Sequence, residues 1–148
     1  MCFDYEKYEK ECETIRTENE IYLDLFEKAL LASGLKEKTV RRHVRNAAFY
    51  INTFLLHEEP KPMKEGTEYS GSFLGYFFIR KCMWSTPASI RSTATSLKKF
   101  YRCMLEHGYI DQQSYDDMCY NIKENMEDWQ ADCAMYNDPD GANPFLMF

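Results

Sequence analysis

Long apolar stretches are absent from this sequence of 148 residues, and glycine and proline are scarce, with six and five copies. The longest apolar cluster, FLGYFFI at 73–79, is far shorter than the roughly 20 residues that cross a bilayer. Residues 1–20 are charged throughout and lack the apolar core of a signal peptide. We therefore expect a cytoplasmic protein that does not associate with a membrane.

Motifs that hold metals or cofactors are also lacking. The sequence has no CxxC pair, no histidine at a ligand spacing from two cysteines, and no glycine-rich phosphate loop. The three histidines lie far apart and have no serine or cysteine partner in a catalytic motif. We expect no metal site, no cofactor and no catalytic residue. The cysteines are expected to be free thiols. They are Cys2, Cys12, Cys82, Cys103, Cys119 and Cys133.

The distribution of apolar residues favours helices. Hydrophobic residues make up 45% of the chain, and they recur at intervals of three and four without the alternation typical of strands. The length suits one domain with one core. The sequence therefore predicts a single all-α domain over 1–148.

Helix-capping residues and prolines divide the first half. We expect a helix over 4–16, and a second one that begins at an N-capping Asn19 and ends at Gly34. A third helix is expected to begin near 36–39 and to continue to His57. The segment that follows contains two prolines and is expected to form a loop over 58–72.

The second half is expected to contain three helices. A very apolar one begins at Ser70 or Ser72, continues to Trp84 and is expected to be the most buried. The next begins at Ser85-Thr86-Pro87, which joins a capping hydroxyl to a first-turn proline, and ends at Gly108. Asp111 is expected to cap the last helix, and a turn-rich tail begins at Asn137. Four aromatic residues are assigned to the core rather than to a base-stacking surface. They are Tyr76, Phe77, Phe78 and Trp84.

Charge separates the chain into three parts. Residues 1–35 hold 4 Lys/Arg against 9 Asp/Glu, residues 36–107 hold 13 against 6, and residues 108–148 hold 1 against 9. A basic middle therefore lies between acidic ends, although the formal net charge is -6.

Most cations of the basic middle fall into two stripes. The first stripe is Lys38, Arg41, Arg42 and Arg45, spaced i, i+3, i+4, i+7 on one face of a helix. The second stripe is Arg91, Thr95, Lys98 and Arg102, with Ser92 and Lys99 beside it. Cations and hydroxyls on a rigid surface are the groups that contact DNA phosphates. The alternative interpretation is that both stripes are ordinary solvated faces, or ion-pair partners of the acidic ends.

The runs GLKEKTVRRHVRNAAFYINTFLL (34–56) and STPASIRSTATSLKKFYRCMLEHGYID (85–111) resemble the core-binding domain of tyrosine recombinases, the phage-type integrases. Gly34, Leu35 and Thr39 match the family's Gly-Leu-Ser-x-x-Thr opening, in which Lys36 replaces the usual serine. The residues that fall on the second family pattern are Ser89, Ile90, Ala94, Thr95, Ser96, Leu97, Lys98, Phe100, Tyr101, Leu105, Gly108 and Ile110, and among them Ala94 stands where leucine is usual.

The resemblance covers about residues 19–111 and implies an orthogonal four-helix bundle of the SAM-like integrase type. To it we add one helix at each end, the last within an acidic extension and tail over 112–148. In the family, the two basic helices face DNA during DNA recombination and integration. The candidate DNA-binding residues are Lys38, Thr39, Arg41, Arg42, Arg45, Arg91, Ser92, Thr95, Lys98, Lys99 and Arg102.

The residues that such a recombinase needs for catalysis are not found in these 148 residues. Strand cleavage there needs an Arg, a His-x-x-Arg pair and a nucleophilic Tyr in a further domain. After residue 111 this sequence has one cation, Lys123, and no histidine. We expect a non-catalytic module that binds double-stranded DNA. The alternative is a protein-interaction or structural module that keeps the scaffold without the DNA role.

The ends of the chain carry two further hypotheses. The apolar tip Phe145-Leu146-Met147-Phe148 is expected to dock into a groove of this domain, to bind a protein partner or to mediate self-association, and a frayed terminus is the alternative. Residues 1–28 or 111–140 could fold back on the basic stripes. In that case, removal of 129–148 strengthens DNA binding at low salt.

Overall fold

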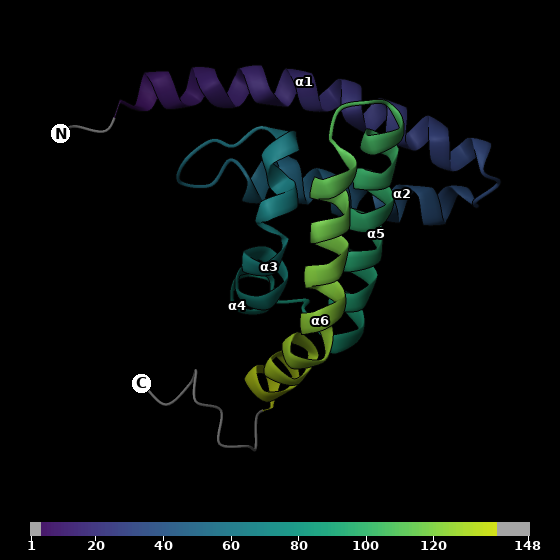
Figure 1. Ribbon diagram of the computed structural model, residues 1–148. Helices are drawn as coiled ribbons and strands as arrows, with labels where there is room; N and C mark the ends of the chain where they lie inside the picture. Colours follow the sequence, from purple (N-terminus) through teal and green to yellow (C-terminus); the bar gives the residue numbers. More distant parts are fainter. Residues whose placement is uncertain (1–3, 139–148) are drawn as a thin grey trace.

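The computed structural model describes residues 4–138, and their secondary structure is entirely helical, as expected (Figure 1). The long helices are α1 (Tyr5–Ala32), α2 (Glu37–Phe49), α5 (Pro87–Glu106) and α6 (Gln112–Asn137). The shorter elements are η1 (Tyr50–Phe54), η2 (Met63–Glu68), α3 (Ser70–Ser72), η3 (Phe73–Phe77) and α4 (Phe78–Lys81). No helix within 4–138 is long and apolar enough to span a bilayer.

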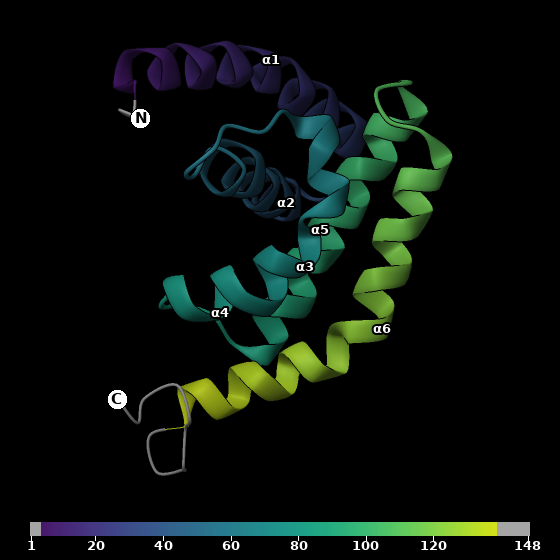
Figure 2. The same cartoon turned by 60° about the vertical axis from the view of Figure 1, so that its left-hand side comes forward.

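Helix α5 lies at the centre of the arrangement. It packs against α2 on one side and against α6 on another. Helix α1 lies across one end of the α5–α6 pair (Figure 1). Helix α6 runs beside α5, bends, and passes beneath the segment from α3 to α4 (Figure 2). The core between these layers is strongly aromatic. Its largest fully buried side chains include Phe26, Tyr50, Phe73, Phe100 and Tyr101.

The prediction of two separate helices before Gly34 is wrong, because α1 continues through Asn19. No proline or glycine interrupts residues 4–32. Asn19 is fully buried, and its Nδ2 donates to Asn52 Oδ1 at 2.8 Å and to the Ile51 carbonyl at 3.3 Å. The polar side chain that suggested a helix start is therefore a buried donor to the neighbouring helix. The helix ends as expected, with Gly34 at φ +89°.

The helix predicted to start near 36–39 is confirmed in outline. It consists of α2 followed by η1, which has π-helical hydrogen bonding, such as Leu55 N to the Tyr50 carbonyl at 2.9 Å. A π-turn accommodates one extra residue. Here it places both Tyr50 and Ile51 in the core. No residue pattern in the sequence indicates this change of helix type.

The loop predicted over 58–72 is only partly a loop. Residues Met63–Glu68 form the 3₁₀-helix η2, and the hydroxyl of Tyr101 donates to the carbonyl of Met63 at 2.8 Å. Gly66 lies so close to Tyr101 and Tyr50 that no side chain fits there. Contacts with Tyr101 and Tyr50 therefore bury part of this segment, although its two prolines suggested an exposed connection.

The apolar helix begins at Ser70, as expected, but ends at Lys81 rather than Trp84. Cys82 leaves the helix with φ −109° and ψ 112°, because the chain must turn into the extended residues that precede Pro87. As a result, the core assignment is wrong for Tyr76 and Trp84, which are 59% and 60% exposed. It is confirmed for Phe78, which is buried, and Phe77 is half-buried.

The boundaries of α5 and the start of α6 are confirmed. Thr86 caps α5 in a capping box with Ser89, Pro87 is its first residue, and Gly108 follows its end with φ +78°. Asp111 caps α6 by accepting from Ser114 N at 2.7 Å. Helix α6 continues to Asn137, whose Nδ2 donates to the Ser85 carbonyl at 2.6 Å. The apolar tip 145–148 lies outside the described residues.

The cysteine prediction is confirmed for the described residues, in which all five are free. Cys12, Cys82, Cys103 and Cys133 are buried and Cys119 is half-buried. Cys2 lies outside the described residues. Burial raises the pKa of Cys82 to about 11, so this thiol behaves as a small apolar side chain.

Candidate nucleic-acid interface

The first basic stripe lies along the solvent side of α2. Its four cations are exposed, and Thr39 beside them is half-buried. Val40, His43 and Ala47 occupy the opposite, buried side of the same helix. The i, i+3, i+4, i+7 spacing therefore places these cations together, as predicted.

The second stripe lies along the solvent side of α5. Arg91, Lys99 and Arg102 are exposed, and the other members are half-buried. The hydroxyl of Thr95 donates to the Arg91 carbonyl at 3.0 Å. A phosphate that met Thr95 would therefore have to compete with a backbone acceptor. The cations remain the better candidates for phosphate contacts.

A buried polar contact joins the two helices that carry the stripes. His43 Nδ1 on α2 and Ser96 Oγ on α5 are 2.7 Å apart, and Asn46 Nδ2 donates to the same hydroxyl at 3.0 Å. His43 is 3% exposed and Ser96 is completely buried. A buried polar group without a hydrogen-bond partner destabilises the fold. This contact therefore favours one relative position of α2 and α5.

Cations of both stripes lie near His43. Burial lowers the pKa of its imidazole, and the charges of Arg42 on α2 and Lys99 on α5 lower it further. One histidine therefore experiences a positive charge from each helix. We call the two stripes, on the adjacent helices α2 and α5, the α2–α5 basic face.

Few carboxylates neutralise this face. Arg41 lies 4.0 Å from Glu37 and Arg102 lies 3.1 Å from Glu106, each within its own helix. Among residues 4–138, no salt bridge joins a stripe cation to 4–28 or 111–138. The ion pairs that would fold the acidic ends back onto the stripes are therefore not formed by these residues.

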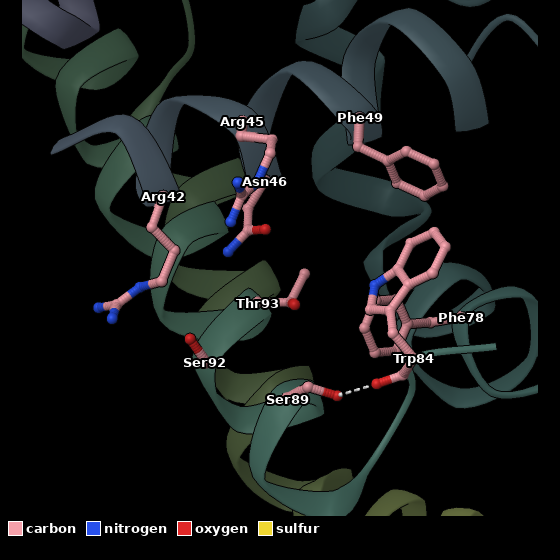
Figure 3. Close-up of a pocket in the computed structure, with 9 residues that line it drawn as sticks. All are labelled: Arg42, Arg45, Asn46, Phe49, Phe78, Trp84, Ser89, Ser92 and Thr93. Carbon is pink, nitrogen blue, oxygen red and sulfur yellow. Dashed lines mark hydrogen bonds between the residues drawn. The ribbon is translucent and has the colours of Figure 1, made fainter. Parts of the chain in front are cut away.

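A cavity of about 500 Å³ opens beside the basic face (Figure 3). Helix α2 provides one side of it, the first turns of α5 provide a second, and Phe78 and Trp84 close the end (Figure 3). It is lined by Arg42, Arg45, Asn46, Phe49, Phe78, Trp84, Ser89, Ser92 and Thr93. Three members of the predicted DNA-binding set, Arg42, Arg45 and Ser92, therefore meet in one place.

Sequence reasoning missed the other walls of this cavity. Asn46, Phe49 and Ser89 have no distinctive spacing, and Trp84 was assigned to the core. One signal did exist, because Met83 and Trp84 directly precede the Ser-Thr-Pro helix start. A chain that must leave one helix and enter another within five residues exposes side chains at the turn.

The histidines and cysteines do not gather into a reactive centre. Within the described residues, no group of three or more His, Cys, Asp or Glu side chains could hold a metal ion. His107 Nδ1 is 2.9 Å from the carbonyl of Cys103, one turn earlier in α5, and His57 is 3.8 Å from Glu58. These are local contacts at helix ends.

No family model, no curated protein and no solved structure matches this chain.

Proposed function

We propose that this chain is a non-catalytic module that binds double-stranded DNA through the α2–α5 basic face. The observation that carries the proposal is the contact of His43 with Ser96, which joins the two helices that carry the stripes, while Arg42 and Arg45 of one stripe line the same cavity as Ser92 beside the other. Phosphate contacts require cations on a rigid support and no particular base sequence. Two packed helices joined by a buried hydrogen bond are such a support.

The availability of the cations supports the same function. In the described part of the chain, six of the eight stripe cations make no salt bridge. They are Lys38, Arg42, Arg45, Arg91, Lys98 and Lys99. A side chain without a carboxylate partner has no ion pair to break when it meets a phosphate, and each neutralised phosphate releases counterions.

The resemblance to the core-binding domain of tyrosine recombinases supports the choice of DNA as the ligand. Its two patterns fall on the start of α2 and on α5, the two helices of the basic face. We infer that the bundle is of the SAM-like integrase type, with α6 as an added helix. The proposal assigns DNA contacts to the module and no strand-cleaving chemistry.

Titration of a mixed-sequence duplex across a salt series tests the proposal. Engagement of four cations predicts a slope of log K against log salt near -3.6, from about -0.9 for each phosphate. The double variant Arg42→Gln/Arg45→Gln is expected to lose about 1.8 from the magnitude of that slope. No detectable binding at about 50 mM salt would overturn the proposal.

A matched control keeps this experiment specific. Lys7 and Lys10 on α1 have the same i, i+3 spacing as Arg42 and Arg45, are exposed, and lie outside the basic face. Lys7→Gln/Lys10→Gln removes the same net charge. It is expected to leave the slope unchanged, whereas an equal loss in both double variants would indicate attraction by overall charge alone.

One observation favours a second candidate function, a protein-interaction module. Met83 is completely exposed and adjoins Trp84 at the turn after α4. Exposed apolar side chains that cluster can mark contact sites. Sedimentation velocity on the wild type and on Met83→Ser tests this. Self-association that Met83→Ser abolishes, together with absent duplex binding, would favour the second function.

A further inference from the structure

We propose that the cavity between α2 and α5 binds a single unpaired nucleotide, with its base stacked on Trp84 and its phosphate held by Arg42 and Arg45. This inference deepens the proposed function and rests on it for the choice of a nucleic-acid ligand. The nucleotide could come from two sources, a free mononucleotide or a base displaced from a DNA duplex.

The aromatic wall favours a flat ring as one part of the ligand. Trp84 makes T-shaped contacts with Phe49 and Phe78, at ring-centroid distances of 5.8 and 6.4 Å. These contacts hold the indole at the end of the cavity, yet 60% of Trp84 remains exposed. Stacking of a base on an aromatic side chain contributes about 1–3 kcal/mol and tolerates any base.

The opposite side of the cavity favours an anion as the other part. Arg42 and Arg45 extend from α2, and no carboxylate is among the residues that line the cavity (Figure 3). Within the described residues neither arginine makes a salt bridge. Guanidinium groups bind phosphates through paired, charge-assisted hydrogen bonds.

Polar groups between these two ends suit the edge of a base or a sugar. Thr93 lies on α5 between the arginines and Trp84, and Ser92, also on α5, lies below Arg42 (Figure 3). The indole Nε1–H of Trp84 faces the side of the cavity where Thr93 lies (Figure 3), and makes no hydrogen bond with the described residues. The volume of about 500 Å³ lies in the range of small-ligand sites, roughly 300–1,000 Å³.

Tryptophan fluorescence tests the proposal directly, because a stacked base quenches an indole. The chain has two tryptophans, and Trp129 is buried while Trp84 is exposed. Deoxyadenosine monophosphate, ribose 5-phosphate, a fully paired duplex and the same duplex with one bulged adenine are titrated separately. Excitation at the red edge of the indole band avoids absorption by the bases. Trp84→Phe identifies the Trp84 contribution.

The expected result is quenching by the mononucleotide, by the bulged duplex, or by both, and none by ribose 5-phosphate. Quenching by the mononucleotide identifies a free nucleotide as a sufficient ligand, whereas quenching by the bulged duplex alone identifies displaced DNA bases. Arg42→Gln/Arg45→Gln is expected to weaken this binding at least about tenfold. Trp84→Ala, followed by equilibrium dialysis, is expected to weaken it by about tenfold.

Tyr120→Ala is the matched control, because Tyr120 is an exposed aromatic residue on α6 that does not line the cavity. It is expected to bind as the wild type does. Absence of quenching by both base-bearing ligands would overturn the inference, as would unchanged affinity in the arginine double variant. Binding of the fully paired duplex, measured in parallel, reports on the proposed function alone, so the two failures are distinguishable.

Discussion

One of the contacts between helix α6 and the rest of the fold is that of Trp129 with Gly75, and substitution of Gly75 by alanine probes it. A methyl group at position 75 would lie 2.6 Å from Cδ1 and 3.1 Å from Cε2 of Trp129, and closer still to Nε1. All three atoms belong to a rigid ring that is 8% exposed. The ring cannot move aside without disturbing the packing of α6.

Two opposing effects set the magnitude. Overpacking of a buried site costs about 1–3 kcal/mol, and a rigid ring places this case near the upper end. Replacement of a helical glycine by alanine contributes about 1 kcal/mol of stability in return. Gly75→Ala is therefore expected to lower the free energy of unfolding by about 2 kcal/mol. In a Trp129→Leu background the clash is gone, and the same substitution should stabilise the protein by about 1 kcal/mol.

Urea denaturation followed by circular dichroism measures the four free energies of this double-mutant cycle. The expected coupling between positions 75 and 129 is about 3 kcal/mol. Gly71→Ala is the control, because a methyl group there meets the flexible amide of Asn121 at 3.0 Å and Trp129 only at 3.7 Å. The same effect of Gly75→Ala in both backgrounds, or a stabilised single variant, would refute the packing argument.

Two further predictions concern buried titratable groups. The pKa of His43 is lowered from its ordinary 6.5 by burial and by Arg42 and Lys99, so the unfolded chain takes up the proton first as the pH falls. Stability to urea should be intact above pH 6.5 and should decrease as the pH falls from there towards the lowered pKa. In His43→Gln this dependence of stability on pH should disappear. An NMR titration that gives His43 a pKa at or above its ordinary value would contradict this. Cys82, with a pKa of about 11, should react with iodoacetamide at pH 8 only at the rate of unfolding, and rapid alkylation of the native protein would be inconsistent with its burial.

Helix boundaries were the most predictable part of the fold, because the residues that cause them act locally. Gly34 and Gly108 adopt the positive φ that ends a helix, and Thr86 and Asp111 cap the next backbone amides. None of these effects depends on a distant part of the chain. The failure at Asn19 has the opposite origin. Its amide has the chemistry of a cap, but its partners lie more than 30 residues away.

The same distinction applies to the segments between helices. Pro60 and Pro62 correctly indicated that no α-helix crosses that region. They could not indicate that Tyr101, 38 residues from Met63, would bind the segment and bury it. The exposure of Trp84 was hidden for a related reason. An apolar sequence predicts burial, but in the short turn between α4 and α5 the neighbouring residues do not cover the ring of Trp84 completely.

The candidate site shows what spacing can and cannot predict. Intervals of three and four were sufficient to place each set of cations on one face of its helix. The distance between the faces depends on the contact of His43 with Ser96, two residues that no motif connects. The cavity walls come from three separate segments, so no single stretch of sequence contains its pattern.

The acidic ends have a consequence for the proposed function even without ion pairs to the stripes. Helices α1 and α6 carry exposed carboxylates, and the formal net charge of the chain is -6, so a DNA duplex is expected to be repelled by these two helices. At low salt this repulsion and the attraction of the stripes both act over long distances; at physiological salt both are confined to about 8 Å. Within that distance the proposed contact of the face with phosphates would outweigh the repulsion from α1 and α6. If the proposed function is correct, we expect the acidic helices to restrict the orientation in which a duplex approaches, because the described residues of these helices form no salt bridge with the stripe cations.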